Sequence, residues 1–255
     1  MEYNSPSALE AGVVHATTVN GVATIRFGHP KSNSLPGALL SRLAETIAEL
    51  GKRPEARVIV LQSEGAGPFC AGASFDEFKA VRDAESGKRF FSGFAHVILA
   101  MIRVPQLVIT RVQGKTAGGG VGLIAASDYA LAVSDAALKL SELALGIGPF
   151  VVGPVIEKKI GLAAFSALAV EAGWHSAAWA ERHGLYAEVL ETQPALDARV
   201  RDFAKQLAGY HPEAVRRLKE TFWEGTGHWP ELLSARAAIS GSLVLSEFTR
   251  KAIGA

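Results

Sequence analysis

The first part of the chain joins a β-rich segment to a helical one. Residues 13–27 read VVHATTVNGVATIRF, two strand-like runs around Asn20-Gly21. This dipeptide favours a tight hairpin because both positions tolerate a positive φ. Residues 36–50 then place Leu39, Leu43 and Ile47 at helical spacing. The sequence therefore predicts an N-terminal β-hairpin followed by a helix.

A strand, a turn of small residues and a helix then occur twice. The apolar strands at 58–61 and 107–109 run into SEGAGPFCAGAS (63–74) and VQGKTAGGGVG (112–122). Helical patterns follow the first turn at about 74–82 and 87–103. A short helix follows the second, before a strand at about 129–133. Continuous apolar strands are typical of a parallel sheet that is buried on both faces, so we expect an α/β fold.

After about residue 150 the pattern becomes mostly helical, with one candidate strand at 186–189. Helices are expected at 196–208, at 212–224 and from 229 onward, and segments such as AAISGSLVL (237–245) are broadly apolar. A face of this kind belongs either to the core or to a subunit interface. We predict an α/β part over residues 1–195 and a helical part over 196–255.

The charge balance and the single cysteine narrow the class of protein. The 255 residues include 26 Lys and Arg against 25 Asp and Glu, a net charge of +1, which disfavours nucleic acid as a partner. Cys70 alone can form no internal disulfide, and we expect a cytoplasmic location. The longest apolar runs fall far short of the roughly 20 residues that span a bilayer, so no membrane partner is expected.

Familiar cofactor motifs do not fit. Gly114-Lys115-Thr116 resembles the end of a phosphate loop, but Ile109 stands where the first glycine of that loop would be. Residues 120–125 fit G-x-G-x-x-A, yet no strand runs straight into the first glycine as a dinucleotide site requires. The seven histidines show no metal-binding spacing. We therefore expect neither a metal nor a redox cofactor.

The two turns of small residues carry the remaining chemical signal. Turns rich in Gly and Ala let a ligand approach bare backbone, and the second turn opens a helix whose first N–H groups have no partner inside the helix. Two such N–H groups that converge would form an oxyanion hole. Close packing of a helix on a strand would also require small residues, so the pattern alone leaves both interpretations open.

Four further segments stand out in order along the chain: NSLPGALL (33–40), PFCAGASF (68–75), VQGKTAGGGVGL (112–123) and LSELALGIGPF (140–150). Together they resemble the successive signatures of the enoyl-CoA hydratase/isomerase family, also called the crotonase superfamily. The resemblance extends over about residues 12–250. It implies a crotonase-type spiral of ββα units that binds an acyl-CoA over residues 1–195, and a helical part over 196–255 that forms trimers or hexamers. Coenzyme A enters as part of the substrate, and no separate cofactor is implied.

The resemblance also assigns roles to residues. The N–H groups of Ala73 and Gly119 would hold the enolate oxygen, and Glu142 would be the acid/base. A wider set would bind the substrate: Lys31, Ser32, Ser34, Ala71, Ser74, Phe75, Gly120 and Gly122. From the residues alone, Glu142 could instead satisfy a turn or a helix start, and Lys31 could be a solvated surface lysine.

One position departs from the pattern of the family's hydratases. These enzymes carry an additional carboxylate three residues after the second oxyanion glycine, where this chain has Gly122. Hydration uses two carboxylates, whereas moving a double bond needs one base that shuttles a proton. The remaining Glu142 favours isomerisation on mechanism, while the breadth of the family favours hydration. The rival interpretation is a catalytically weak acyl-CoA-binding or assembly protein of the same fold.

Overall fold

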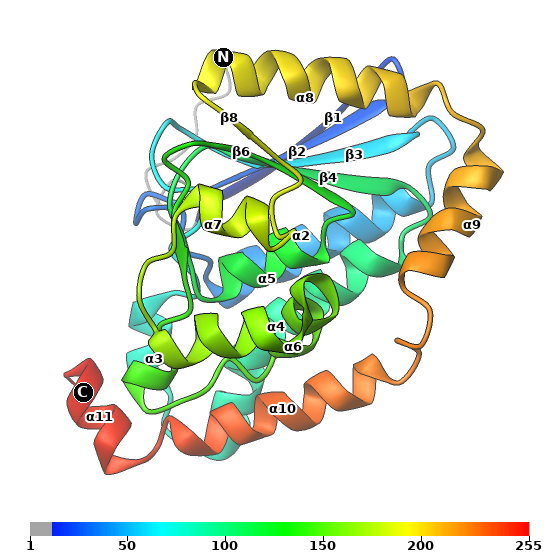
Figure 1. Cartoon of the computed structure of the whole chain (residues 1–255). Coiled ribbons are helices and arrows are strands. Elements are labelled where there is room, and N and C mark those ends of the chain that lie inside the picture. Colours follow the sequence, from blue (N-terminus) through cyan, green and yellow to red (C-terminus); the bar gives the residue numbers. More distant parts are fainter. Residues whose placement is uncertain (1–11, 255) are drawn as a thin grey trace, which may run out of the picture.

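The computed structural model describes residues 12–254 and is built on a six-stranded sheet of order β1-β2-β3-β4-β6-β8 (Figure 1). Only β1 runs antiparallel to its neighbour. The strands are β1 (Val13–Val19), β2 (Val22–Gly28), β3 (Val58–Ser63), β4 (Leu107–Val112), β6 (Tyr129–Val133) and β8 (Glu188–Leu190). The predicted α/β class is confirmed.

The N-terminal hairpin forms where the Asn-Gly signal predicts it. Val19 pairs with Val22, and the two residues between them, Asn20 and Gly21, have φ angles of 50° and 82°. Both angles lie in the left-handed region, which Asn and Gly tolerate better than other residues. The turn therefore fixes the register of β1 against β2, and β2 in turn starts the parallel part of the sheet.

Helices cover both faces of the sheet (Figure 1). On one face α8 (Gln193–Ala208) contacts five of the six strands, β2, β3, β4, β6 and β8. The other side carries α2 (Gly37–Gly51), α4 (Ala84–Arg103), α5 (Gly119–Ala126) and α6 (Gly153–Glu171). The apolar face predicted for the first helix is fully buried, since Leu39, Leu43 and Ile47 have no exposed surface.

Local capping explains where two helices begin. α4 starts at Ala84, three residues before its apolar pattern, because Asp83 and Ser86 form a reciprocal capping box that satisfies two backbone N–H groups. Ser74 caps the short α3 (Phe75–Ala80), and its hydroxyl accepts a hydrogen bond from the N–H of Glu77 at 3.4 Å. This second cap fixes the end of the first small-residue turn.

The C-terminal helices pack within the same core. α10 (Trp229–Leu243) lies along α4, so closely that a Cβ atom on Gly87 would be 2.7 Å from the Cα of Gly241. Part of the apolar segment 237–245 therefore serves the core of this chain rather than a subunit interface. The division predicted between residues 195 and 196 falls inside α8, and its use as a domain boundary stays a prediction.

Two elements differ from the sequence prediction. The last strand, β8, begins at Glu188 rather than at residue 186, because the Tyr186 N–H donates to the carbonyl of Ala180 in the preceding helix, at 3.3 Å, instead of pairing with a neighbouring strand. A second, two-stranded sheet of β5 (Thr116–Ala117) and β7 (Leu138–Lys139) was not predicted. Strands of two residues are too short to show a periodic pattern.

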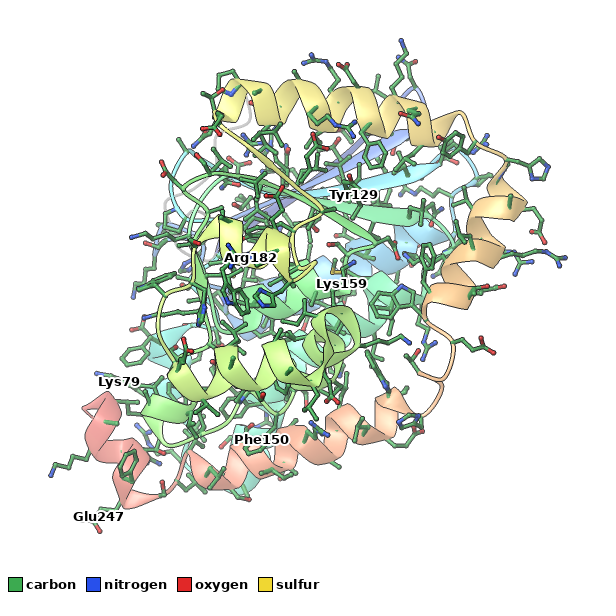
Figure 2. All side chains as sticks on the ribbon, in the orientation of Figure 1. Lys79, Tyr129, Phe150, Lys159, Arg182 and Glu247 are labelled. Carbon is green, nitrogen blue, oxygen red and sulfur yellow. The ribbon has the colours of Figure 1, made fainter. Side chains whose placement is uncertain are left out.

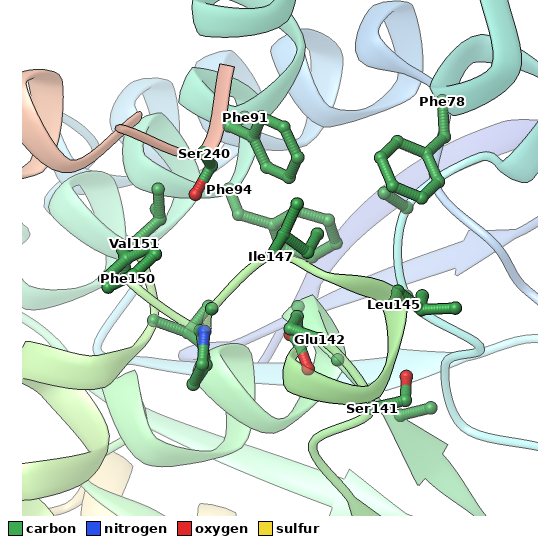
Figure 3. A pocket seen from close by; sticks show the side chains of 18 of the residues that line it. Phe78, Phe91, Phe94, Ser141, Glu142, Leu145, Ile147, Phe150, Val151 and Ser240 are labelled. Carbon is green, nitrogen blue, oxygen red and sulfur yellow. The ribbon is translucent and has the colours of Figure 1, made fainter. Parts of the chain in front are cut away.

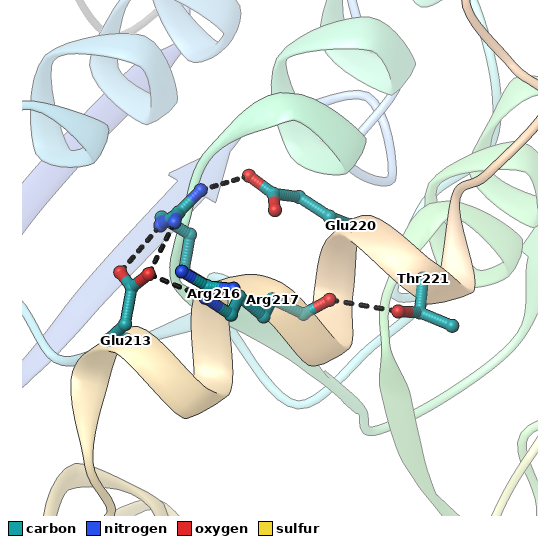
Figure 4. Close-up of polar contacts among 5 residues, drawn as sticks. All are labelled: Glu213, Arg216, Arg217, Glu220 and Thr221. Atoms are coloured by element: carbon teal, nitrogen blue, oxygen red, sulfur yellow. Dashed lines mark hydrogen bonds and ion pairs between the residues drawn. The ribbon is translucent and has the colours of Figure 1, made fainter.

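The helix α9 (Pro212–Phe222) has two contrasting polar faces. Outside, Arg216 and Arg217 pair with Glu213 and hold its pKa at about 2 (Figure 4). Exposed pairs of this kind contribute little to stability. Inside, the ammonium group of Lys219 lies 3.0 Å from a carboxylate oxygen of Asp128, and both side chains are almost fully buried. This buried pair attaches α9 to the sheet.

The remaining helices complete the molecule. α7 (Ala177–Arg182) precedes β8, and α11 (Glu247–Ile253) packs against the 3-10 helix η1 (Leu143–Leu145). From α6, the Lys159 ammonium group donates to the carbonyl of Ser127 at 2.9 Å (Figure 2). Within residues 12–254, no helix is both long enough and apolar enough to cross a membrane.

Candidate active site

The two small-residue turns lie against each other. The N–H of Ala117 donates to the carbonyl of Cys70 at 2.9 Å, which joins the second turn to the first. A Cβ atom on Gly72 would lie 3.1 Å from the Ala117 oxygen and 3.8 Å from the Gly119 nitrogen. Gly72 also has a φ of 92°, which other residues rarely adopt. Glycine at this position therefore permits the two backbones to meet.

Two backbone N–H groups remain without partners where the turns meet. In the described part of the chain, neither the Ala73 N–H nor the Gly119 N–H forms a hydrogen bond. Gly119 is the first residue of α5, so its N–H has no partner inside the helix, and the helix dipole adds positive potential there. The arrangement leaves two donors available to an oxygen atom that carries negative charge.

Glu142 lies beside these donors. A Cβ atom on Gly118 would be 3.3 Å from Oε1 of Glu142, so the carboxyl group rests on the backbone that precedes Gly119. The residue is held by its own carbonyl, which accepts hydrogen bonds from the N–H groups of Leu145 and Ile147, both at 3.1 Å. The backbone around η1 thus fixes where the carboxyl group points.

The carboxyl group of Glu142 is enclosed and poorly satisfied. Its Oε2 atom is buried and has no hydrogen-bond partner in the described structure. Burial raises the pKa of Glu142 to about 7, and the backbone N–H groups of Glu142 and Ser141 oppose this rise only in part. A carboxyl group with this pKa can both accept and donate a proton near neutral pH.

A cavity of about 300 Å³ opens beside the carboxyl group (Figure 3). Its apolar wall comprises Phe75, Phe78, Phe90, Phe91, Phe94, Leu145, Ile147, Phe150, Val151 and Val152. Its polar side chains are Lys139, Ser141, Glu142 and Ser240. Among the described residues that line the cavity, Glu142 is the only acidic one. An apolar chain therefore fits the cavity, with the proton-transfer group at one place on its wall.

The structure brings five of the predicted site residues together. Ala71, Ala73, Phe75, Gly119 and Glu142 all line this cavity, although they come from three separate segments of the chain. The other predicted residues lie behind or beside its wall.

Gly120 and Gly122 lie on the buried side of α5, away from the cavity lining. A Cβ atom on Gly120 would be 2.7 Å from the Cβ of Cys70, and one on Gly122 would be 2.5 Å from Cγ1 of Val152. Both distances are far below a normal van der Waals contact. Close packing thus explains both glycines, and the side chain of Val152 occupies the space that a larger residue at position 122 would need.

Four predicted residues lie beside the cavity. The Lys31 ammonium group pairs with Asp76, and both side chains are exposed. The Ser32 carbonyl accepts a hydrogen bond from the Ala71 N–H at 3.2 Å, and the Ser34 hydroxyl lies 3.2 Å from Nδ1 of His29. Ser74 is the N-cap of α3 described above. These residues hold the first turn in place and frame its outer side.

The sequence reasoning missed several residues of the cavity. Phe90, Phe91 and Phe94 all lie on α4 and line the cavity, and the rings of Phe90 and Phe91 are in contact, so this run of aromatic residues is a signal in the sequence that could have been used. The sequence around Lys139 and Ser240 gives no local sign that these residues line a cavity. The ammonium group of Lys139 lies 4.8 Å from the centre of the Trp174 ring. No group of three or more potential metal ligands occurs within the part of the chain that the structure describes.

The sequence pattern of one enzyme family, described as enoyl-CoA hydratase/isomerase, matches residues 17–241. The chain belongs to this family. The crystal structure of enoyl-CoA hydratase from Bacillus halodurans superposes with a TM-score of 0.86 at 21% identity, and the match covers 94% of this chain and 98% of that one. The crotonase-type fold expected from the sequence is therefore confirmed.

Relatives within the enoyl-CoA hydratase/isomerase family act on different CoA esters. Mitochondrial methylglutaconyl-CoA hydratase of Rattus norvegicus is 32% identical over 197 residues, which cover 76% of this chain and 62% of that protein. Ethylmalonyl-CoA decarboxylase of Danio rerio is 25% identical over 114 residues, 44% of this chain and 37% of the relative. The chain thus spans less than two thirds of the length of either relative.

Proposed function

We propose that the protein is an acyl-CoA enzyme that isomerises the double bond of an enoyl-CoA. The observation that carries the proposal is the buried carboxyl group of Glu142, whose Oε2 atom has no hydrogen-bond partner in the described structure, next to two free backbone N–H groups in an otherwise mostly apolar cavity. Ala73 and Gly119 would supply those N–H groups to the thioester oxygen. Glu142 would act as the single acid/base.

The proposed reaction needs one proton carrier. Ionised Glu142 removes a proton from C2 of a 3-enoyl-CoA, and the electron pair of that C–H bond moves into a dienolate whose oxygen is held by the N–H groups of Ala73 and Gly119. The protonated Glu142 then returns the proton to C4, which moves the double bond to C2–C3. Atoms and charge balance, and the carboxylate is regenerated.

The pKa of about 7 supports this role of Glu142. A carboxyl group with this pKa is about half ionised at neutral pH, so both of its protonation states are available, and its ionised form takes a proton from carbon more readily than an ordinary carboxylate does. The absence of another acidic side chain from the described cavity wall also agrees with a reaction that uses one carboxyl group.

Hydration of a 2-enoyl-CoA is the second candidate. It is favoured by the 32% identity with methylglutaconyl-CoA hydratase. In this chain one carboxyl group would have to activate the water and protonate the α-carbon, because Gly122 carries no second acid and Val152 fills the space beside it. The third candidate is an acyl-CoA-binding or assembly protein with weak catalysis.

We further propose that the first turn binds the coenzyme A part of the substrate. Ala71 lines the cavity, and Ser32 and Ser74 hold the backbone on either side of it through the hydrogen bonds described above. Lys31 would exchange Asp76 for a phosphate group. Both side chains of this ion pair are exposed, so the exchange requires no unfolding. Replacing Lys31 with Met should raise the KM for the acyl-CoA while leaving kcat close to that of the parent protein.

We also propose that the protein assembles as a trimer or hexamer in the cytoplasm. Leu162 and Val170 on α6 are 65% and 70% exposed, so this helix presents apolar side chains outside the core. The single cysteine agrees with a reducing compartment. Sedimentation at micromolar concentration tests the assembly, and a stable monomer would contradict it.

The reaction is tested by product identification. The purified protein is incubated with 3-enoyl-CoA and 2-enoyl-CoA substrates of several chain lengths, and the products are separated and weighed by mass spectrometry. Isomerisation leaves the mass unchanged, whereas hydration adds one water. Isomerisation of the 3-enoyl-CoA is expected to be faster than hydration of the 2-enoyl-CoA. Faster hydration would favour the second candidate, and tight binding of acyl-CoA without turnover would favour the third.

A further inference from the structure

We propose that Ser240 binds an oxygen atom on the acyl group of the substrate, away from the thioester. This inference rests on the proposed function as an acyl-CoA enzyme and makes Ser240 a specificity-determining residue. The substrate class would be an enoyl-CoA whose acyl group bears an oxygen-containing substituent, rather than a plain alkyl chain.

The Ser240 hydroxyl is buried, unpartnered and part of the cavity wall. The residue is 1% exposed, and its Oγ has no hydrogen-bond partner among the described residues. Two residues later on the same helix, the exposed Ser242 hydroxyl donates to the carbonyl of Ala238 at 3.1 Å. The Ser240 hydroxyl makes no such bond, and therefore keeps both its proton and its lone pairs for a ligand.

A hydroxyl in this position is unfavourable unless a ligand satisfies it. A buried polar group without a hydrogen bond has lost its hydration and gained nothing in return. Alanine or valine would fill an apolar wall without that cost. An oxygen atom of the substrate that accepts a hydrogen bond from Ser240 would remove the cost in the complex, which gives the residue a function in recognition.

The backbone that carries Ser240 is held rigidly. The next residue, Gly241, packs against α4, where a Cβ atom on it would lie 2.5 Å from the backbone nitrogen of Lys88. Helices that pack this closely cannot shift without losing the contact. The Ser240 hydroxyl is thus presented from a fixed position, as a group that discriminates between substrates should be.

Ser240 lies at the acyl end of the cavity. In Figure 3 it is grouped with Phe150 and Val151 at one end, whereas Ser141 lies at the other and Glu142 between them. The thioester oxygen is assigned to the N–H groups of Ala73 and Gly119, and the carboxyl group of Glu142 lies against Gly118, the residue before Gly119. An oxygen bound by Ser240 would therefore belong to the acyl chain.

The oxygen could belong to a neutral group or to a carboxylate, and a variant of Arg236 can distinguish these two possibilities. This arginine is one helical turn before Ser240, is half-buried, and forms no ion pair or hydrogen bond within residues 12–254. Its Nη1 atom would lie 3.7 Å from a Cβ atom on Gly153, which follows the cavity residue Val152. A carboxylate on the substrate would interact with both Arg236 and Ser240, whereas a hydroxyl or ketone would require only the hydrogen bond with Ser240.

The experiment compares kcat/KM for three enoyl-CoA substrates of equal chain length. One is unsubstituted, one ends in a hydroxyl group and one ends in a carboxylate. The parent protein is expected to prefer at least one oxygenated substrate by about tenfold, the effect of one good hydrogen bond. Ser240→Ala should abolish that preference through KM, with kcat for the preferred substrate changing little. Ser242→Ala, the same substitution on an exposed site of α10, should leave the preference unchanged.

Arg236→Met identifies the source of the oxygen. If the protein recognises a carboxylate, this substitution should lower kcat/KM only for the substrate that ends in a carboxylate. If the recognised group is neutral, kcat/KM should stay the same for both oxygenated substrates. The proposal is overturned if the parent protein prefers neither oxygenated substrate, or if Ser240→Ala keeps the preference. If no substrate is turned over, the proposed function fails. In that case calorimetry measures the affinity of the parent protein and of Ser240→Ala for the same three thioesters. Ser240 keeps its proposed role only if the parent protein binds an oxygenated thioester more tightly and Ser240→Ala loses this preference.

Discussion

The carboxyl group of Glu142 rests on the backbone of Gly118. A Cβ atom on Gly118 would lie 3.3 Å from Oε1 of Glu142, and Gly118 has φ 54° and ψ −125°, a conformation outside the regions that other residues prefer. The missing side chain thus serves two purposes. It permits the turn that presents the Gly119 N–H, and it lets the acid/base approach that turn.

Gly118→Ala is expected to lower kcat at least about tenfold, because the new methyl group presses on the Glu142 carboxyl group and moves it from its position. The strained φ should also lower the free energy of unfolding by about 1–2 kcal/mol. Gly225→Ala is the matched control, since Gly225 has a similar φ of 79° but no atom within 4 Å of the Cβ position. The control should lose stability and keep its activity. Equal kcat in the two variants would contradict the contact.

The stability of the protein should depend on pH through Glu142. The pKa rises from 4.5 to about 7 on folding, so between these values the unfolded chain releases a proton that the folded protein keeps. The contribution is therefore fully present below pH 4.5 and is lost as pH rises through 7, by about 3 kcal/mol in all. Glu142→Gln removes this dependence.

Thermal unfolding at pH 5 and pH 8 measures the effect. The Tm difference between Glu142→Gln and the parent protein should move in favour of the variant from pH 5 to pH 8. Glu157→Gln, an exposed glutamate on α6, is the control and should show the same small difference at both pH values. A Tm difference for Glu142→Gln that does not change with pH would show that this carboxyl group titrates normally.

Gly122→Ala should destabilise the protein by about 1–3 kcal/mol, the usual effect of overpacking a core. A Cβ atom on Gly122 meets Val152 at 2.5 Å, and both residues are buried. Gly227→Ala is the control, because nothing lies within 4 Å of its Cβ position. Urea unfolding measures both. If Gly122→Ala leaves the free energy of unfolding unchanged, the Val152 side chain can move aside easily, and a second carboxylate could be introduced at position 122.

Lys219→Met should lower the free energy of unfolding by about 3–5 kcal/mol, because it leaves the buried Asp128 carboxylate without its cation. It also removes the donor to the carbonyls of Met101 and Gln106, at 2.7 and 2.6 Å. Lys205→Met, an exposed lysine on α8, should change stability little. Equal urea midpoints for the two variants would rule out a stabilising role for the buried pair.

The sequence predicted the elements whose signals are local. Leu39, Leu43 and Ile47 repeat at the helical period, and Asn20-Gly21 marks a turn by its own backbone preferences, so both elements formed where expected. Contacts between distant segments leave no such signal. Lys219 and Asp128 are 91 positions apart, and neither reveals the other in the sequence.

The candidate site also has parts that the sequence predicts from local signals and parts that only the folded structure shows. The two small-residue turns stand out because backbone access requires Gly and Ala in consecutive positions, and Glu142 followed from the family resemblance. The cavity wall combines α3, α4, the loop after Glu142 and one residue of α10. Ser240 could not be found beforehand, since its significance lies in the lack of a partner in the folded chain.

The central claim is that Glu142 alone carries the proton in a reaction on an acyl-CoA enolate. The most direct measurement is the rate of conversion of a 3-enoyl-CoA by the parent protein and by Glu142→Gln, with the products identified. The account predicts a 2-enoyl-CoA product and a kcat at least about 10²-fold lower for Glu142→Gln, with KM almost unchanged, because the amide keeps the shape but cannot accept a proton. Undiminished turnover by Glu142→Gln, or efficient hydration by the parent protein that survives this substitution, would contradict it.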